Sequence, residues 1–288
     1  MTPMPYTLDL PADRNTCVVF PSPHSGRDYP ADFLARSVLD TWAIRSSEDA
    51  FVDRLFSAAP LFGAPLLVAH APRAFIDLNR AADELDPAVV EGVPRPLHNP
   101  RVSSGLGVIP RVVANGRAIY RGRITRIEAE ARIARHWRPY HARLAALVEE
   151  SLGLYGQAIL IDCHSMPHEA VESASLARTG RPEVVLGDRF GAAAAPWVVE
   201  PVEQAFRDAG FRVARNAPFA GAYITQAYGR PSRGVHAIQI EIDRALYLDE
   251  AGMRPGPGFE TLKAALSGVI AEIARIGRHE DRAPLAAE

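Results

Sequence analysis

Short β-branched runs alternate with amphipathic helical stretches along most of the chain, and this alternation restricts the fold more than any other feature. Strands are predicted within residues 16–26, 64–73, 74–79, 157–167, 181–191, 211–218 and 235–249. Helices are predicted within 30–38, 48–63, 124–156, 196–210 and 258–277, where apolar residues recur at helical spacing. This order indicates an α/β sheet with helices on both faces. We expect one domain over residues 1–288, with a frayed tail from about 278.

Two stretches depart from the simple alternation. The longest helical pattern, 124–156, contains Pro139, which should kink or split the helix because proline lacks a backbone N–H. Residues 83–117 are rich in Pro, Gly, Asn and Ser and show little periodicity, so they should form a long loop region. Loops of this length are usually functional or disordered.

Bulk composition argues against several classes of protein. The formal net charge of −2 does not favour nucleic acid as a partner, because phosphate binding needs a basic surface. No apolar run approaches the roughly 20 residues that span a bilayer, and the first residues lack the pattern of a signal peptide. We therefore expect a cytoplasmic protein that binds neither membrane nor nucleic acid, with Cys17 and Cys163 both free. The oligomeric state has no signal in the sequence.

Two predicted strands end in a histidine. His24 follows the run "VVF" and a short turn, and His164 follows the run "ILI". Because reactive groups of α/β sheets gather beyond the carboxyl ends of the strands, the two imidazoles should lie close together. Singly, His24 is more simply a packed turn histidine and His164 a strand-end histidine bonded to a backbone carbonyl, but as a pair they indicate metal ligands. Asp162 shares a strand face with His164 and is placed to support it.

A hydrolytic zinc site needs about three protein ligands and an open position for water. The segment 46–53 offers Glu48, Asp49 and Asp53 as the third ligand. Neighbouring acids at a helix start point about 100° apart, so Glu48 and Asp49 cannot both reach one ion without distortion. Acids that follow two serines also suit helix capping, and periodicity alone leaves the metal role and the capping role open.

The segment 73–80 gathers charged and amide side chains near a predicted strand end. Arg73 and Arg80 bracket Asp77 and Asn79. Two guanidiniums and an amide would make a clamp for carboxylates, since arginine offers forked, bidentate hydrogen bonding. A salt-bridged surface loop, in which Asp77 pairs with one arginine, explains the same residues equally well.

Glu241 alternates with Ile238, Ile240 and Ile242 in a predicted strand, so it lies on the opposite face together with Gln239. A carboxylate in a sheet covered on both sides must be paired or must face a cleft. Glu241 is therefore either a satisfied buried glutamate or a general base beside a metal ion. The chain has no G-x-S-x-G elbow, Walker lysine motif or G-x-G-x-x-G, so a serine hydrolase and a nucleotide-binding protein have no support.

Eight motifs then suggest a family. In chain order they are VVFPSPHSG, EDAFVDRL, FIDLNR, LGVIPR, LIDCHSMP, VLGDRFG, GAYITQAYGRP and VHAIQIEIDRALYLDE. Together, over about Val18 to Glu250, they resemble the N-formylglutamate amidohydrolase family of histidine degradation, which is related to zinc carboxypeptidases and aspartoacylases. The resemblance implies a three-layer α/β/α sandwich with a mixed, mostly parallel sheet.

The resemblance also implies roles for the segment 73–80. Aspartoacylase-like enzymes carry an Asp-Leu-Asn-Arg segment, matched here from Asp77 to Arg80. It implies substrate binding by this segment, with Asn79 and Arg80 holding a carboxylate of the substrate. An upstream arginine of those relatives polarises the scissile carbonyl, and Arg73 occupies a similar place.

In the same relatives, the histidines that match His24 and His164 bind zinc, and the late strand glutamate that matches Glu241 is the general base. One departure concerns the remaining ligand. Carboxypeptidases and aspartoacylases use His-x-x-Glu, but here the third residue after His24 is an arginine. The resemblance places the acid at Asp49, with Glu48 as the reserve.

Three hypotheses follow from the resemblance and the residues. The first is a zinc-dependent amidohydrolase that cleaves N-formyl-L-glutamate to formate and L-glutamate, with another divalent transition metal as an alternative to zinc. The second keeps the enzyme class but changes the substrate to another N-acyl amino acid or a small peptide. The third is a metal-binding protein without turnover, against which the presence of Glu241 argues.

Overall fold

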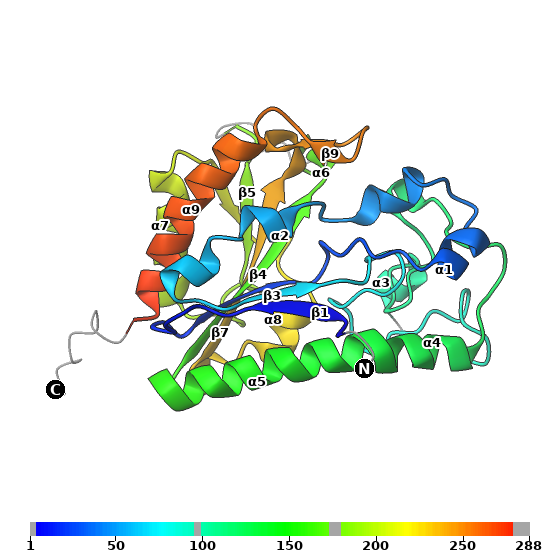
Figure 1. Cartoon of the computed structure of the whole chain (residues 1–288), viewed down its shortest axis with the longest axis horizontal. Helices are drawn as coiled ribbons and strands as arrows, with labels where there is room; N and C mark the ends of the chain where they lie inside the picture. The colour runs from blue at the N-terminus through cyan, green and yellow to red at the C-terminus, as the bar shows by residue number, and fades with distance from the viewer. Residues whose placement is uncertain (1–3, 95–98, 173–179, 279–288) are drawn as a thin grey trace.

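Seven strands form a mixed sheet through the centre of the molecule, in the order β1-β3-β2-β4-β7-β5-β6 (Figure 1). The structure, a computed structural model, describes residues 4–94, 99–172 and 180–278. β1 runs antiparallel to β3 and β5 antiparallel to β7, whereas the other neighbours are parallel. The strands are β1 (Tyr6–Asp9), β2 (Val18–Ser22), β3 (Leu66–Ala69), β4 (Ala158–Met166), β5 (Val184–Gly187), β6 (Val213–Arg215) and β7 (Val235–Asp243); β8 (Leu248–Asp249) and β9 (Arg254–Pro255) form a separate pair.

Helices cover both faces of this sheet, which gives the three-layer sandwich expected from the sequence. α7 and α9 lie on one face, and the long α5 runs along the other (Figure 1). The helices are α1 (Ala31–Arg36), α2 (Val52–Leu55), α3 (Pro100–Ser103), α4 (Arg126–Arg132), α5 (Arg138–Tyr155), α6 (His168–Glu172), α7 (Pro196–Asp208), α8 (Tyr223–Tyr228) and α9 (Phe259–Ile276). Within the described part of the chain, none of the helices combines the length and apolarity needed to traverse a bilayer.

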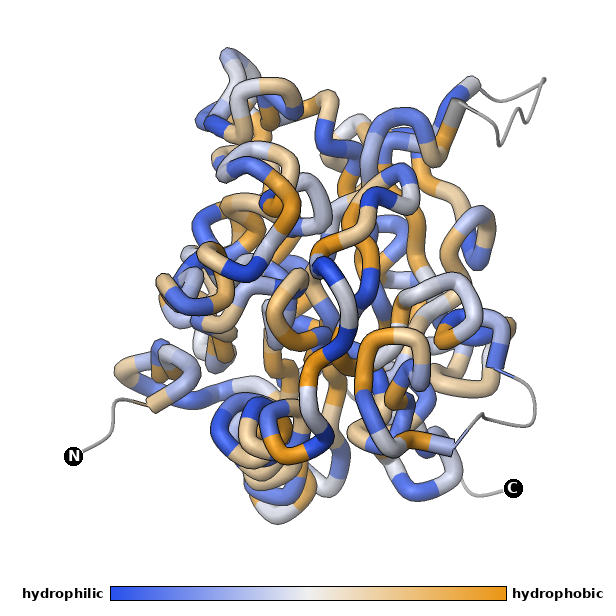
Figure 2. The backbone as a smooth tube through the Cα atoms, turned by 90° about the vertical axis from the view of Figure 1, so that its right-hand side faces the viewer, coloured by the Kyte–Doolittle hydropathy of each residue, from blue (hydrophilic) through white to orange (hydrophobic). Residues whose placement is uncertain are grey.

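Alternate residues of the central strands enter two different apolar cores. In β4, Ile159 and Ile161 pack in the core beneath α7 and α9, whereas Leu160 lies in the core beneath α5. Figure 2 shows hydrophobic segments, in orange, in the interior of the molecule. Because side chains alternate along a strand, Asp162 and His164 follow on the side of Leu160. The strand therefore directs Asp162 and His164 away from the α7–α9 core.

The end of α9 is hydrogen-bonded to the residues just before β2. Cys17 N donates to Gly277 O just beyond α9 (3.2 Å), and Thr16 Oγ1 donates to Ala274 O (2.7 Å). A Cβ atom on Gly277 would lie 2.3 Å from Thr16 Oγ1, so this close approach requires a residue without a side chain. The start of β2 and the end of α9 are thus joined directly.

The long helical stretch contains a wider turn where the sequence predicts an interruption. A π-helical turn, Ile133–Trp137, connects α4 to α5, and Pro139 lies in the first turn of α5. Proline removes one N–H donor and crowds the preceding turn, and a local π turn is a common way to accommodate such a site. The helix continues through it (Figure 1).

Two predictions about secondary structure are wrong. Residues 74–79 form turns rather than a strand, because Phe75 N and Ile76 N both donate to Pro72 O instead of to a neighbouring strand. The helix predicted upstream of Gly63 is reduced to α2 and a short 3-10 turn, which ends at the left-handed glycine (φ 86°).

The expectations for the cysteines and the tail have different outcomes. Cys17 and Cys163 are both buried and are not joined by a disulfide bond, as predicted. The tail expected to fray lies outside the described residues from 279 onward.

Candidate active site

The carboxyl ends of adjacent parallel strands bring the predicted polar residues together. β4 pairs with β7 so that His164 lies beside Glu241 and Asp162 lies beside Gln239. β2 is the other neighbour of β4, and the turn after it carries His24. Both histidines therefore reach one edge of the sheet, as their strand-end positions predict.

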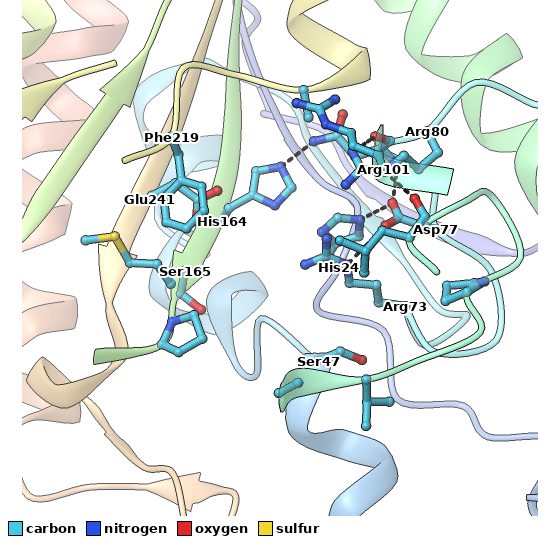
Figure 3. A pocket seen from close by; sticks show the side chains of 18 of the residues that line it. His24, Ser47, Arg73, Asp77, Arg80, Arg101, His164, Ser165, Phe219 and Glu241 are labelled. Atoms are coloured by element: carbon cyan, nitrogen blue, oxygen red, sulfur yellow. Dashed lines mark hydrogen bonds and ion pairs between the residues drawn. The ribbon is translucent and has the colours of Figure 1, made fainter. Parts of the chain in front are cut away.

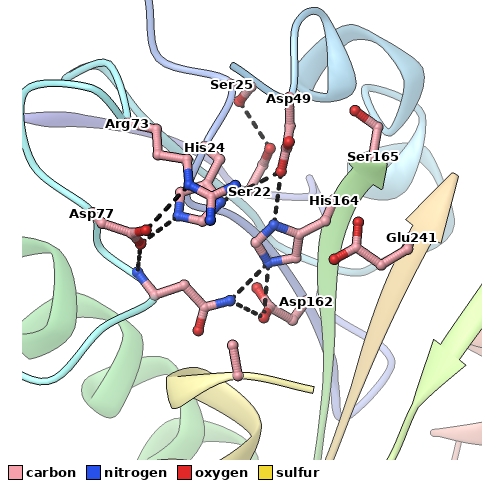
Figure 4. Close-up of polar contacts among 12 residues, drawn as sticks. Ser22, His24, Ser25, Asp49, Arg73, Asp77, Asp162, His164, Ser165 and Glu241 are labelled. Atoms are coloured by element: carbon pink, nitrogen blue, oxygen red, sulfur yellow. Dashed lines mark hydrogen bonds and ion pairs between the residues drawn. The ribbon is translucent and has the colours of Figure 1, made fainter. Parts of the chain in front are cut away.

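His24, Asp49 and His164 form a compact, buried group (Figure 4). Their possible ligand atoms all lie within 4.8 Å of one another. Asp49 Oδ2 is 2.8 Å from His164 Nδ1 and 3.4 Å from His24 Nδ1. The three side chains that the sequence analysis selects as metal ligands are thus neighbours in space, although they come from three separate segments.

Two further aspartates orient the imidazoles from behind. His24 Nε2 lies 2.7 Å from Asp77 Oδ1, and His164 Nε2 lies 2.9 Å from Asp162 Oδ2. When each Nε2–H donates to its carboxylate, each Nδ1 presents a lone pair toward Asp49. His24 Nδ1 is buried and has no hydrogen-bond partner among the described residues. This donor set, two imidazoles with carboxylate support and one carboxylate, fits a divalent transition metal ion.

Of the three acids considered as the remaining ligand, Asp49 is the one beside the histidines. Glu48 accepts hydrogen bonds from Tyr29 Oη (2.6 Å) and Arg45 Nε (3.0 Å), so this reserve ligand is engaged elsewhere. Asp53 forms an ion pair with a half-exposed arginine. The placement agrees with the choice of Asp49 that the family resemblance implies.

Arg244 fixes the carboxylate of Asp49. Arg244 Nη2 donates to Asp49 Oδ1 at 3.0 Å, while its other nitrogens donate to Ser46 O (3.2 Å) and Ser165 Oγ (3.3 Å). The guanidinium is buried and therefore held in one geometry. It occupies one oxygen of Asp49 and leaves the other oxygen facing the two histidines.

Glu241 is buried beside His164 and is held by its strand neighbour. Gln239 Nε2 donates to Glu241 Oε1 at 2.6 Å, and Gln239 Oε1 accepts from Ala222 N at 2.9 Å. Burial raises the pKa of Glu241 to about 7, against the opposing effect of His164. One carboxylate oxygen is therefore fixed by the protein, and the group lines the cavity described below.

Arg73 and Asp77 form an ion pair next to His24. Arg73 Nε donates to Asp77 Oδ2 at 3.1 Å. Burial alone would raise the pKa of Asp77, but His24 and Arg73 outweigh it and hold that pKa well below its usual range. Asp77 therefore pairs with one arginine, as one of the two interpretations of this segment predicts. The pair lies at a buried carboxylate, however, and not on a surface loop.

Asn79 connects the segment to His164. Its Nδ2 donates to Asp162 Oδ2 and lies 3.0 Å from His164 Nε2, while its Oδ1 accepts from Ile224 N at 2.7 Å. Both polar atoms of the amide therefore have protein partners.

Arg80 is a buried cation whose bonded partners are neutral. Its Nε donates to Leu106 O (2.8 Å) and its Nη1 to Asn79 O (2.9 Å). Burial, together with the nearby Arg73 and Arg101, lowers the pKa of Arg80. Within the described part of the chain no carboxylate forms an ion pair with it.

A cavity of about 510 Å³ lies next to the His24–Asp49–His164 group, and both histidines and Glu241 line it (Figure 3). Its size is in the range of pockets for small molecules. Segments 112–116 and 218–222 form much of its wall. Among the side chains that line it are those of His24, Arg73, Asp77, Asn79, Arg80, Arg101, His164, Gln239, Glu241 and Arg244.

Three of these lining residues have no role in the sequence analysis. Gln239 is placed on the strand face of Glu241 but without a function, and Arg244 could have been found from its position directly after a strand end. Arg101 lies in the long loop region, where the sequence offers no periodicity from which to place it.

Comparison with known proteins agrees with the resemblance. A family model described as N-formylglutamate amidohydrolase matches residues 16–248. The chain belongs to the N-formylglutamate amidohydrolase family. N-formylglutamate deformylase of Pseudomonas aeruginosa is 31% identical over 220 residues, covering 75% of this chain and 74% of that protein. The Pseudomonas putida enzyme of the same name is 28% identical over 241 residues, covering 79% and 80%.

A solved structure of this family has the same fold. The crystal structure of N-formylglutamate amidohydrolase from Ralstonia eutropha JMP134 matches with a TM-score of 0.88 and 38% sequence identity, over 96% of this chain and 99% of that one. Membership in the N-formylglutamate amidohydrolase family and the α/β/α fold expected from the sequence are therefore both confirmed.

Proposed function

We propose that this chain is a metal-dependent amidohydrolase that cleaves N-formyl-L-glutamate to formate and L-glutamate. The observation that carries the proposal is one cavity lined by His24, His164, Glu241 and the unpaired Arg80, with Asp49 buried beside the two histidines. The names of the relatives support the same reaction and substrate. A cytoplasmic location stays a prediction of the sequence.

The metal ligands in this proposal are His24, Asp49 and His164. A Zn²⁺ ion, or another divalent transition metal, supplies a Lewis acid that makes water more acidic and polarises a carbonyl group. Asp77 and Asp162 keep the imidazoles in the tautomer that leaves Nδ1 free. Arg244 keeps Asp49 turned toward them.

Glu241 acts as the general base and then as the general acid. Its carboxylate takes a proton from the water that attacks the formyl carbon, and it returns this proton to the leaving nitrogen when the C–N bond breaks. The products are formate and the free amine of glutamate. Gln239 holds one oxygen of Glu241 and so limits the proton transfers to the other oxygen.

The arginines bind charge on the substrate. Arg73 Nε is engaged by Asp77, and the rest of its guanidinium faces the cavity, where it stabilises the negative charge that develops on the former carbonyl oxygen. Arg80 binds a carboxylate, because it is a buried cation without an acidic partner. We assign Asp77 and Asn79 to positioning the histidines, since their polar atoms already have protein partners.

Formate release combined with metal analysis tests the proposal. The protein is stripped with a chelator, reloaded with Zn²⁺ and assayed with N-formyl-L-glutamate and with N-acetyl-L-glutamate. We expect about one metal ion per chain, and formate release only after reloading. Faster acetate release would favour an enzyme for other N-acyl amino acids. A tightly bound metal ion without turnover on either compound would favour a binding protein.

A further inference from the structure

The cavity contains more positive charge than the protein itself neutralises. Four guanidiniums line it, those of Arg73, Arg80, Arg101 and Arg244. Two of them are paired with aspartates, at distances of 3.1 Å and 3.0 Å. Arg80 and Arg101 form no ion pair with the residues that the structure describes. Two positive charges thus remain available to a ligand.

The backbone of Arg101 lies next to Arg80 through Leu106, and the charge of Arg101 contributes to the lowered pKa of Arg80. Arg80 Nε donates to Leu106 O at 2.8 Å, and Leu106 N donates to Arg101 O at 2.8 Å. Figure 3 draws both guanidiniums on the same side of the cavity. Like charges held close together repel each other, and an anionic ligand relieves that repulsion.

The backbone that carries Arg101 is fixed, although its side chain is exposed. Asn99 Oδ1 accepts from Arg101 N (3.1 Å), and Asn99 Nδ2 donates to Glu84 Oε1 (2.9 Å). Farther along the loop, a Cβ atom on Gly107 would lie 2.4 Å from Glu84 O, so the two loop segments pack closely. The exposed guanidinium of Arg101 is therefore attached to a backbone that hydrogen bonds hold in place at the edge of the cavity.

We infer that Arg101 binds the side-chain carboxylate of the substrate, while Arg80 binds its α-carboxylate. The inference rests on the proposed function, since N-formyl-L-glutamate presents two carboxylates to a cavity with two unpaired guanidiniums. The α-carboxylate is attached next to the reacting amide, which suits the buried Arg80 beside Asn79 and the histidines. The side-chain carboxylate lies at the far end of the molecule and suits the more exposed Arg101.

The position of Arg101 predicts how its loss acts on the kinetics. A contact at the far end of the substrate is the same in the ground state and in the transition state, so it affects KM rather than kcat. Because the group is exposed, a solvated ammonium should replace it nearly as well as a guanidinium.

Charge-removing variants with a matched substrate pair test the inference. Arg101→Gln is compared with Arg123→Gln, an exposed arginine away from the cavity, on N-formyl-L-glutamate and N-formyl-L-glutamine. We expect Arg101→Gln to lower kcat/KM for the glutamate compound about tenfold, through KM, and to leave the glutamine compound within about twofold. Arg101→Lys should restore most of the loss, and Arg123→Gln should change neither substrate.

Two results would overturn the inference while leaving the proposed function intact. In the first, wild-type protein releases formate from N-formyl-L-glutamate, and Arg101→Gln lowers activity on both substrates equally. In the second, Arg101→Gln has no more effect than Arg123→Gln. Failure of the wild-type, metal-loaded protein on both substrates would instead overturn the proposed function, and the inference with it.

Discussion

The strand-end floor of the cavity and its loop wall hold their charged groups in different ways. The floor consists of His24, His164, Gln239 and Glu241, with Asp49 beside the histidines, and the loop wall is the part of the wall formed by residues 99–116. On the floor, acids and imidazoles are buried and have short protein contacts, such as the 2.6 Å bond from Gln239 to Glu241. On the wall, the backbone of Arg101 is anchored but its side chain is exposed.

This difference separates two tasks. Groups that act on the reacting atoms must be held within a fraction of an ångström, and strands with supporting hydrogen bonds provide that precision. A group that attracts an anion needs only charge and approximate position. Substitutions on the floor should therefore reduce kcat or metal binding, whereas substitutions on the wall should act mainly through KM.

The largest effect is expected from Glu241→Gln, because this substitution removes the base but keeps the size and shape of the side chain. Formate release should fall by about 10²–10⁴-fold, with metal content and Tm unchanged. Glu200→Gln, on the exposed side of α7, serves as the control and should be neutral. Wild-type turnover in Glu241→Gln would show that this carboxylate is only a satisfied strand residue.

A smaller effect is expected from Arg80→Lys, at the border between floor and wall. Lysine retains the charge but cannot reproduce the forked geometry or the two carbonyl contacts of Arg80. The loss in kcat/KM for N-formyl-L-glutamate should be about 2–4 kcal/mol, or roughly 30- to 1000-fold.

The control for Arg80 is an N-formylated amine that carries no carboxylate. This compound should be a poor substrate of the wild-type protein and should lose little further activity in Arg80→Lys. Equal losses for the two compounds would assign Arg80 to the support of the fold rather than to the substrate.

The smallest of these effects is expected from Arg244→Lys. This substitution should weaken metal affinity rather than substrate binding. Lysine cannot contact Asp49, Ser46 and Ser165 at once, so Asp49 should lose its fixed orientation. The dissociation constant for Zn²⁺ should rise about 10- to 100-fold in a chelator competition titration. Unchanged affinity would mean that the histidines alone position the metal. The exposed Arg254→Lys is the matched control.

Sequence patterns predict many of the floor residues because these residues lie in or directly after strands that apolar runs mark. Apolar runs predict β4 and β7, and alternation within these strands places Asp162 with His164 and Gln239 with Glu241. The pairing of β4 with β7 then places His164 beside Glu241, a contact that neither strand's own pattern predicts. The pairing of the strands and the choice between Glu48 and Asp49 both depend on contacts between distant segments. Local patterns do not contain these contacts, so the choice of Asp49 comes from the family resemblance.

The prediction fails where local pattern and tertiary contacts disagree. Ile76 and Leu78 are buried and read as a strand, but the segment folds into turns after Pro72 and fills the core from a loop. β1 was not predicted because it is a short edge strand with alternate half-exposed residues. Arg101 could not be placed, since its loop is held by individual hydrogen bonds rather than by a repeating pattern.

The junction between β2 and α9 has a consequence for the order in which the protein assembles. Residues just before β2, which leads to His24, hydrogen-bond to the end of the last helix, and β2 pairs with β4 from the middle of the chain. Such contacts between distant segments make folding slow, because long loops must close before the contacts form. During synthesis His24 leaves the ribosome long before His164, so a metal ion held by His24, Asp49 and His164 together would bind only after this later segment has been made.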